Sequence, residues 1–227
     1  SYTIGRLQMV LKSLFFWKRP STRYNLNYVN ISKGEQFEPS FLKISPNNRM
    51  PAIIDPDGPD GREISIFESG AILQYLGRKT KMFYPSDYRK QIEVDQWLFW
   101  QVGNLGPMGG QAHHFRNYSQ TKLQYAIDRY TNEVNRLYGV LNKKLSDGRE
   151  YIAKDYTIAD MACIGWVRNP ERKGQDLENF PYLKLWFERM MARPAVIKGV
   201  SIGAGINHDL SKDLEAQKIL FGQKARD

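Results

Sequence analysis

The chain has 227 residues, of which 41% are apolar and 13% aromatic, and a formal net charge of +9. This length allows one large domain or two smaller ones, with enough apolar side chains to bury a core. The single cysteine, Cys163, excludes an intrachain disulfide framework, and no apolar run approaches the ~18 residues that a membrane-spanning helix needs. We therefore expect a cytoplasmic protein that does not enter a membrane.

The basic residues are scattered along the chain and interleaved with acidic ones. A nucleic-acid-binding surface usually shows a dense basic cluster, so a solvated surface is the ordinary interpretation, and attraction of a small anionic ligand is the functional alternative. The histidines lack the spacing of metal ligands, because His113 and His114 are adjacent and His208 lies far along the chain. We expect no nucleic-acid partner and no metal site.

The first part of the chain predicts strands. Alternating apolar residues indicate one strand within 24–32, and two short apolar runs at 49–55 and 63–69 indicate two more. The Pro/Asp/Gly cluster at 56–61 favours a hairpin turn between the last two. These strands are too few for a doubly wound sheet, so a small α/β unit is expected.

A helix follows the last strand and then a linker. Apolar residues recur at helical spacing after Ser69, which is a suitable N-cap, and the helix is expected to end near Gly77. Pro85 stands in a segment that breaks the pattern. We expect a thioredoxin-like α/β domain at 1–83 and an all-α domain at 84–227.

The second part of the chain predicts helices. The periodicity is helical from Tyr88, and a Gly/Pro-rich bend is expected at 103–110 before a long amphipathic helix within 120–145. The sequence T-I-A-D at 157–160 is a capping box, in which the hydroxyl and the carboxylate each satisfy a free amide at a helix start. A further helix is expected to stop before Pro194.

Two motifs of the α/β unit carry chemistry. In N-N-R-M-P-A-I-I, Pro51 precedes a strand, where it removes an amide that the sheet would use. A cis Met50–Pro51 bond would turn the Met50 backbone toward solvent, free to pair with an extended peptide ligand; a plain turn is the alternative. In F-E-S-G-A-I, Glu68 and Ser69 could hold an amino-acid head group at a helix start; simple capping is the alternative.

These motifs occur together, in an order that is typical of one family. From Y-V-N-I-S-K-G-E-Q-F through R-M-P-A-I-I-D and F-E-S-G-A-I-L-Q-Y-L to Y-T-I-A-D-M-A and R-P-A-V-I-K-G, most of the chain resembles the glutathione transferases. It is similar to the nu-class bacterial enzymes and to the related fungal prion-type nitrogen regulator. The resemblance implies a thioredoxin-like N-terminal domain, an all-α C-terminal domain, a glutathione site between them and a homodimer.

The resemblance also implies roles for individual residues. Met50 would bind glutathione through its backbone, and the Glu68–Ser69 pair would hold the γ-glutamyl head. Arg49 and Arg129 would meet carboxylates. The implied glutathione ligands are Gln36, Arg49, Met50, Glu68, Ser69 and Arg129. The implied residues on the second-substrate side are Trp100, Gln111 and His114.

Residues 5–21 depart from the family. They lack the pattern T-P-N-G-x-K-V-S-I-x-L-E-E, whose Thr and Asn would stabilise the glutathione thiolate. Read one base out of frame, they can encode T-P-P-N-G-L-K-V-S-I-F-L-E-E-A-F, and the codons of Trp17 and Lys18 then force a glutamate. We hypothesise that this segment is translated from the wrong frame; a divergent N-terminus or a targeting arm are the alternatives. The catalytic residue of the chain as written is unknown, and we expect weak or no activity from it.

The resemblance implies that a bound glutathione thiolate reduces small disulfides or glutathionyl mixed disulfides. Since the protein would bring no cysteine to this exchange, two glutathiones would supply the sulfur chemistry. Conjugation of glutathione to an electrophilic substrate and reduction of peroxides are the weaker activities that the resemblance implies. A non-catalytic interaction module of the same fold is the main alternative, although the chain lacks the Asn/Gln-rich arm of a prion-type regulator. A nucleic-acid-binding module, suggested only by charge, is a weaker alternative.

Overall fold

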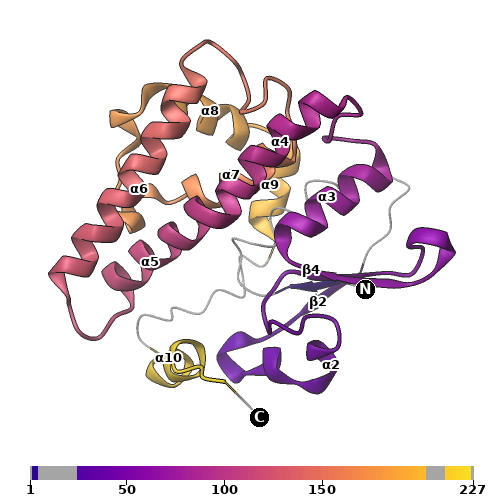
Figure 1. Ribbon diagram of the computed structural model, residues 1–227. Helices are drawn as coiled ribbons and strands as arrows, with labels where there is room; N and C mark the ends of the chain where they lie inside the picture. Colours follow the sequence, from indigo (N-terminus) through magenta and orange to yellow (C-terminus); the bar gives the residue numbers. More distant parts are fainter. Residues whose placement is uncertain (1, 5–24, 203–212, 226–227) are drawn as a thin grey trace. The chain divides into compact units, whose positions relative to one another are not determined.

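A computed structural model of the protein describes residues 2–4, 25–202 and 213–225 (Figure 1). Residues 5–21, which carry the reading-frame hypothesis, lie outside this described part of the chain. Within it, none of the helices is both long enough and apolar enough to cross a bilayer.

The contacts divide the chain into two compact units. The sheet unit consists of Ser1–Tyr75 together with Lys198–Asp227, and the helical unit consists of Leu76–Ile197. The C-terminal residues therefore belong with the N-terminal ones, and not with the helices that precede them in the chain.

The sheet unit contains a four-stranded mixed sheet of the order β2-β1-β3-β4. The strands are β1 (Tyr2–Ile4), β2 (Leu26–Tyr28), β3 (Ala52–Asp55) and β4 (Ile64–Phe67). Strand β1 pairs with β2 in parallel and with β3 in antiparallel orientation, and β3 pairs with β4 in antiparallel orientation. This confirms the expected thioredoxin-like unit, although β2 is much shorter than the apolar pattern suggested.

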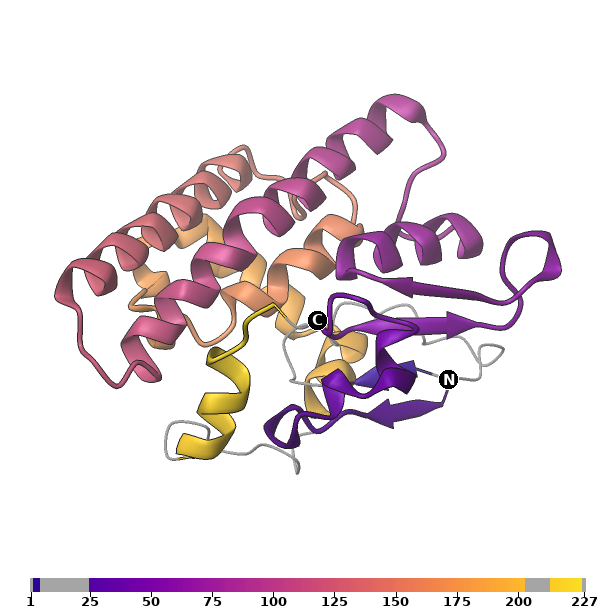
Figure 2. The same ribbon diagram turned by 60° about the horizontal axis from the view of Figure 1, so that its bottom comes forward.

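Strands β3 and β4 form the predicted hairpin (Figure 2). The Gly58 amide donates to the Arg62 carbonyl over 2.9 Å, and the Asp57 amide donates to the Asp55 carboxylate over 3.0 Å. The Pro/Asp/Gly cluster therefore closes the turn as its residue types predict.

The sheet unit also contains short helical elements. The cluster of Phe41, Met50 and Ala52 forms a buried core in this unit. The described elements are the 3₁₀ helices η1 (Ile31–Lys33), η2 (Glu35–Phe37) and η3 (Pro59–Gly61), and the α-helices α2 (Pro39–Leu42) and α10 (Leu214–Phe221). Helix α10 packs against η1.

Helix α3 (Ser69–Thr80) differs from the prediction at both ends. The Ile72 amide donates to the Glu68 carbonyl, so Glu68 holds the N-cap position that was expected for Ser69. The helix continues past Gly77 because that glycine serves packing and not termination: a Cβ atom there would lie 2.7 Å from the Tyr84 Cβ.

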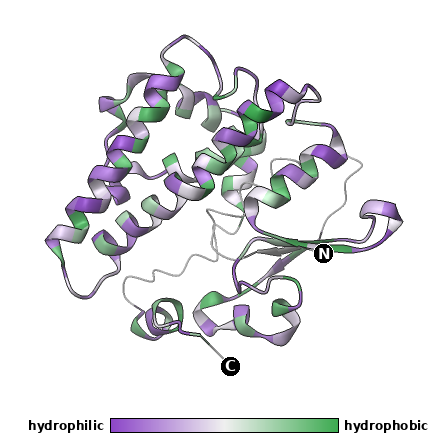
Figure 3. Ribbon diagram, in the orientation of Figure 1, coloured by the Kyte–Doolittle hydropathy of each residue, from purple (hydrophilic) through white to green (hydrophobic). Residues whose placement is uncertain are grey.

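The helical unit is built around the amphipathic helix α6, along which hydrophilic and hydrophobic residues alternate (Figure 3). Helix α6 packs against α5 and α8, and α4 packs against α7. The elements are α4 (Tyr88–Trp100), the π-helical turn η4 (Gln101–Leu105), α5 (Gly106–Asn117), α6 (Gln124–Leu145), α7 (Ile158–Val167), η5 (Pro170–Lys173), η6 (Leu177–Asn179) and α8 (Pro181–Met191). Helix α9 (Pro194–Ser201) begins in this unit, and its last residues belong to the sheet unit. The long helix expected within 120–145 and the stop before Pro194 are confirmed.

The bend expected at 103–110 is wrong, because this segment is helical throughout. Two of its glycines lie against the indole of Trp166: added Cβ atoms at Gly109 and Gly110 would come within 3.1 and 3.7 Å of the ring. Packing of the indole against a bare backbone offsets the ~1 kcal/mol by which each glycine disfavours a helix.

The predicted capping box is present at the start of α7. The Ala159 amide donates to the Thr157 hydroxyl, and the Thr157 amide donates to the Asp160 carboxylate. Asp160 is fully buried and also accepts hydrogen bonds from the Ile152 amide and the Trp186 indole. Burial raises the pKa of Asp160, and its donors favour the charged form. The box therefore also ties α7 to α8.

Candidate functional site

The pairing of β3 with β4 brings together the two sequence motifs of the sheet unit, N-N-R-M-P-A-I-I and F-E-S-G-A-I. Ala52 pairs with Phe67, and the strands run in opposite directions. The segment that precedes β3 and the segment that follows β4 therefore lie at the same end of the hairpin. These segments contain Met50–Pro51 and Glu68, respectively.

The Met50–Pro51 peptide bond is cis. The Met50 side chain is buried in the core, and the preceding carbonyl, that of Arg49, accepts a 2.7 Å hydrogen bond from the Ser45 hydroxyl. Among the described residues, no group bonds to the Met50 amide or carbonyl. The backbone at this point is thus available to an extended peptide.

Glu68 and Ser69 follow β4 directly. Glu68 has a left-handed backbone with φ 67°, a conformation that costs a non-glycine residue of the order of 1–3 kcal/mol and is often found at functional sites. Its exposed carboxylate accepts a 3.4 Å hydrogen bond from the Asn47 amide group, which links it to the loop before β3. Ser69 is buried at the first turn of α3, where free amides attract anions.

Gln36, in η2, is only 1% exposed. Neither its side-chain oxygen nor its side-chain nitrogen has a hydrogen-bond partner in the described part of the protein. A buried polar group without a partner costs about 1–3 kcal/mol. An unsatisfied amide of this kind indicates a place for a ligand that can both donate and accept.

Arg49 is exposed, and its guanidinium is held on one side. One terminal nitrogen, Nη1, donates to the Asn48 side-chain oxygen over 2.6 Å and to the Gln223 side-chain oxygen over 2.8 Å. Within the described residues, no acceptor engages Nε or Nη2. That edge of the guanidinium is suited to a carboxylate with two parallel hydrogen bonds. Gln223 is a residue that the sequence analysis did not single out.

The other predicted residues lie in the helical unit. Gln111 and His114 lie one turn apart on α5, and Arg129 lies exposed on α6. The Phe115 and Tyr130 rings stack at 5.5 Å and join these two helices. The structure therefore places all three residues on one pair of packed helices.

Two of these helical residues have distinct surroundings. Burial lowers the pKa of His114, which favours its neutral form near pH 7. Trp100, at the end of α4, packs edge-to-face against Trp97 at 5.2 Å and is half-buried. A neutral imidazole and an indole suit contact with an uncharged part of a ligand better than binding of an anion.

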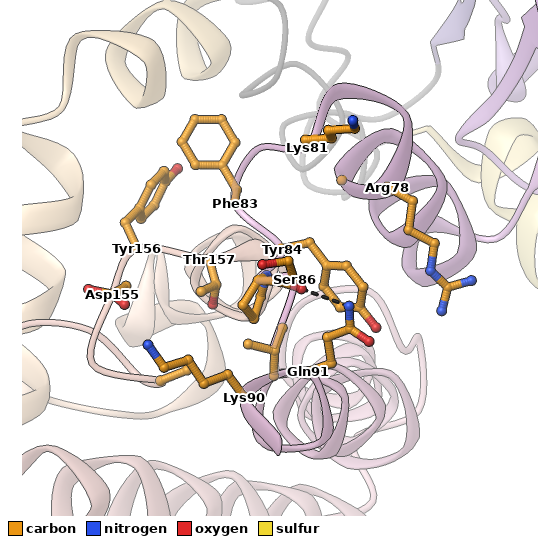
Figure 4. Close-up of a pocket in the computed structure, with 14 residues that line it drawn as sticks. Arg78, Lys81, Phe83, Tyr84, Ser86, Lys90, Gln91, Asp155, Tyr156 and Thr157 are labelled. Carbon is orange, nitrogen blue, oxygen red and sulfur yellow. Dashed lines mark hydrogen bonds between the residues drawn. The ribbon is translucent and has the colours of Figure 1, made fainter. Parts of the chain in front are cut away.

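A separate hollow of about 740 Å³ lies in the helical unit, between the end of α3 and the loop before α7 (Figure 4). Lys81, Lys90 and Tyr156 are among the residues that line it, and the Gln91 side chain donates to the Pro85 carbonyl at its wall. None of the predicted site residues lines this hollow. It is therefore not part of the candidate site.

Two family models match the chain, one mainly in the sheet unit and one in the helical unit. The model of the glutathione S-transferase N-terminal domain matches residues 11–78, and that of the C-terminal domain matches residues 107–194. The chain belongs to the glutathione S-transferase family. The predicted family membership is confirmed by these matches.

Two curated proteins and one crystal structure are similar to this glutathione S-transferase family member over most of its length. The disulfide-bond oxidoreductase YfcG of Escherichia coli (strain K12) is 48% identical over 81% of this chain and 86% of YfcG. The transcriptional regulator URE2 of Saccharomyces cerevisiae is 33% identical over 86% of this chain and 64% of its own length. The crystal structure of a glutathione transferase family member from Pseudomonas fluorescens pf-5, with two glutathione bound, has a TM-score of 0.82 and 37% identity over 88% of this chain and 91% of that chain.

The group that would activate a thiol is not among the residues described above. The Thr and Asn pattern expected of this transferase family member would fall within residues 5–21, which lie outside the described part of the chain. The described site therefore contains groups that could bind a peptide ligand, and its catalytic residue stays unassigned.

Proposed function

We propose that this protein is a glutathione-dependent enzyme that reduces small disulfides or glutathionyl mixed disulfides. The observation that carries the proposal is the meeting of an unengaged Met50 backbone and the Glu68 carboxylate at one end of the β3–β4 hairpin. Glutathione is an extended tripeptide with one ammonium group, two carboxylates and one thiol. These groups are complementary to the backbone, the acid and the guanidinium edge of the site.

Each ligand group has a proposed partner. Glu68 takes the ammonium of the γ-glutamyl residue, and Ser69 with the free amides of α3 takes its carboxylate. The Met50 backbone pairs with the cysteinyl residue, which fixes the position of the thiol. Arg49 binds a carboxylate through Nε and Nη2. The buried side-chain amide of Gln36 forms hydrogen bonds with the ligand backbone.

The helical unit supplies the remaining proposed contacts. Arg129 provides a cation for a carboxylate of glutathione. We propose Trp100, Gln111 and His114 as contacts of the second substrate. A half-buried indole and a neutral imidazole there favour the uncharged portion of a disulfide substrate.

The proposed reaction balances with two molecules of glutathione. The first glutathione thiolate attacks one sulfur of the substrate disulfide, forms a glutathionyl mixed disulfide and releases one substrate thiolate, which takes a proton. The second glutathione thiolate attacks the glutathione sulfur of that mixed disulfide and releases the other substrate thiolate. The products are two substrate thiols and glutathione disulfide. Cys163 is fully buried and takes no part.

We also propose that the protein is a cytoplasmic homodimer. Tyr88, Ile92 and Phe99 are 75%, 44% and 65% exposed and lie on one face of α4. A row of large exposed apolar side chains is typical of an interface, and a second copy of the same helix would cover it. The single cysteine agrees with a reducing compartment.

A non-catalytic role is the second candidate. It is favoured by the similarity to URE2 together with the missing thiol-activating pattern in residues 5–21. Such a protein would bind glutathione without turning over a disulfide.

One experiment separates these candidates. We would measure glutathione binding by calorimetry and reduction of hydroxyethyl disulfide for two full-length chains, one with the sequence as written and one with residues 5–21 in the shifted frame. We expect both chains to bind glutathione and only the frame-corrected chain to reduce the disulfide at a substantial rate. Binding without turnover by both chains would favour the regulator, and no binding by either chain would contradict the proposed site.

A further inference from the structure

The C-terminal segment of the described chain is anchored on the sheet unit. Asp213 caps α10 by accepting a 2.9 Å hydrogen bond from the Ala216 amide, and Ala216 and Gln217 are buried. Gly34 has φ 82°, and a Cβ atom there would lie 3.8 Å from a methyl group of Ile219. Helix α10 thus packs against η1 and the loop that joins η1 to η2 (Figures 1 and 2). The buried Gln36 lies in η2, directly after this loop.

Gln223 follows this helix, and both the nitrogen and the oxygen of its side-chain amide form hydrogen bonds. Its Nε2 donates to the Leu220 carbonyl over 3.2 Å, and its Oε1 accepts from Arg49 Nη1 over 2.8 Å. The first bond orients the amide, because it leaves only the oxygen to face the guanidinium. The second joins residues that are 174 positions apart in the chain.

The bond to Gln223 determines which edge of the Arg49 guanidinium is left for a ligand. The two protons of Nη1 are taken by the neutral oxygens of Asn48 and Gln223, so Nε and Nη2 form the edge left for a ligand. Since both acceptors are uncharged, they orient the guanidinium without cancelling its charge. A carboxylate at either position would form an ion pair and compete with an anionic ligand.

The surroundings are positively charged. Lys33, Lys218 and Lys224 line a hollow of about 500 Å³ beside Gln223, between η1 and the C-terminal segment. Lys218 is paired with Glu215, and among the described residues neither Lys33 nor Lys224 has an ion-pair partner. The field at this edge of the sheet unit therefore favours the carboxylate end of a ligand.

We infer that Gln223 is a positioning residue of the glutathione site: it fixes the Arg49 guanidinium so that its free edge meets a glutathione carboxylate. This inference rests on the proposed function. It makes the C-terminal segment part of the binding site through Arg49, although Gln223 does not touch the ligand.

A double-mutant cycle tests this inference on the full chain. We would measure the dissociation constant of glutathione by calorimetry for the parent and for Gln223→Ala, Arg49→Ala and the double variant, with Leu214→Ala, at a 55% exposed uncharged position of α10, as the control. We expect Gln223→Ala to weaken binding about tenfold in the parent and not at all once Arg49 is removed. Circular dichroism and thermal unfolding would verify that α10 stays folded in each variant.

Steady-state kinetics on the frame-corrected chain adds a second readout. We expect Gln223→Ala to raise KM for glutathione and leave kcat within about twofold, because the contact acts on binding and not on the thiol. If Gln223→Ala binds as tightly as the parent, or weakens binding equally with and without Arg49, the inference is wrong while the proposed function stands. If the parent itself binds no glutathione, the proposed function fails and the inference fails with it.

Discussion

Ala52 of β3 pairs with Phe67 of β4, and this pairing brings the Met50 backbone and the Glu68 carboxylate to the same end of one hairpin. A second contact, the 3.4 Å hydrogen bond from Asn47 to Glu68, holds the two flanking loops together. A peptide lying along the backbone at Pro51 would therefore have one of its ends near the acid. The proposed binding site depends on the register of this hairpin, because a slip by one residue would turn the side chains to the other face.

The proposed ammonium partner can be tested by Glu68→Gln. This change keeps the acceptor for Asn47 and removes the negative charge. Loss of a charge-assisted hydrogen bond of about 1.5–3 kcal/mol weakens glutathione binding on the order of 10- to 100-fold. The measurement is calorimetry, with Glu63→Gln, an exposed acid just before β4, as the matched control that should leave affinity unchanged. Equal affinities for both variants would remove Glu68 from the site.

The buried amide of Gln36 predicts opposite effects on stability and on binding. Gln36→Leu replaces two unpartnered polar atoms by apolar ones of similar shape. We expect the free energy of unfolding in urea to rise by about 1–3 kcal/mol and the affinity for glutathione to fall at least tenfold.

Gln217→Leu is the comparison for Gln36. Gln217 is also buried, but its polar group has a partner. Leucine should therefore lower the free energy of unfolding at position 217. A loss of stability at both positions would contradict the interpretation of Gln36 as an unsatisfied group.

The proposed dimer predicts that a charge on the exposed face of α4 separates the subunits. Phe99→Glu places an unpaired carboxylate within the proposed apolar interface, which costs several kcal/mol. We expect light scattering to show dimers for the parent and monomers for this variant. Tyr125→Glu, at an 83% exposed site on α6, should leave the dimer intact. A monomeric parent would contradict the proposal.

A buried lysine predicts how stability depends on pH. Lys173 is 2% exposed and donates to the carbonyls of Arg168 and Asn169. Burial lowers its pKa from 10.5 to about 8. Between these values the unfolded chain holds a proton that the folded chain has lost, so the free energy of unfolding rises with pH by up to about 3 kcal/mol.

Urea unfolding from pH 7.5 to 10.5 measures this rise. The neutral amine still carries two protons for the two carbonyls, so the fold keeps both hydrogen bonds. The difference between the parent and Lys173→Met isolates the contribution of this group from all others. Parallel pH profiles for the two proteins would show that Lys173 stays charged in the folded state.

The parts of the fold that could be predicted depend on interactions between residues that are close together in the chain. The hairpin turn at 56–61, the capping box of Thr157 and Asp160 and the long helix α6 depend on residues close in the chain. The expected bend at 103–110 and the expected stop at Gly77 were wrong for a common reason. In both places glycine permits close approach of a distant or neighbouring aromatic residue, Trp166 or Tyr84, and its conformational freedom is not used.

Family membership and the two kinds of unit can be predicted from the amino-acid sequence, because the order of the motifs and the local residue patterns indicate both. The burial of Gln36 without a hydrogen-bond partner among the described residues, and the bond from Arg49 to Gln223, are seen in the folded chain alone. Both facts depend on which distant segments pack together, and burial and long-range hydrogen bonds leave no local trace in a single sequence.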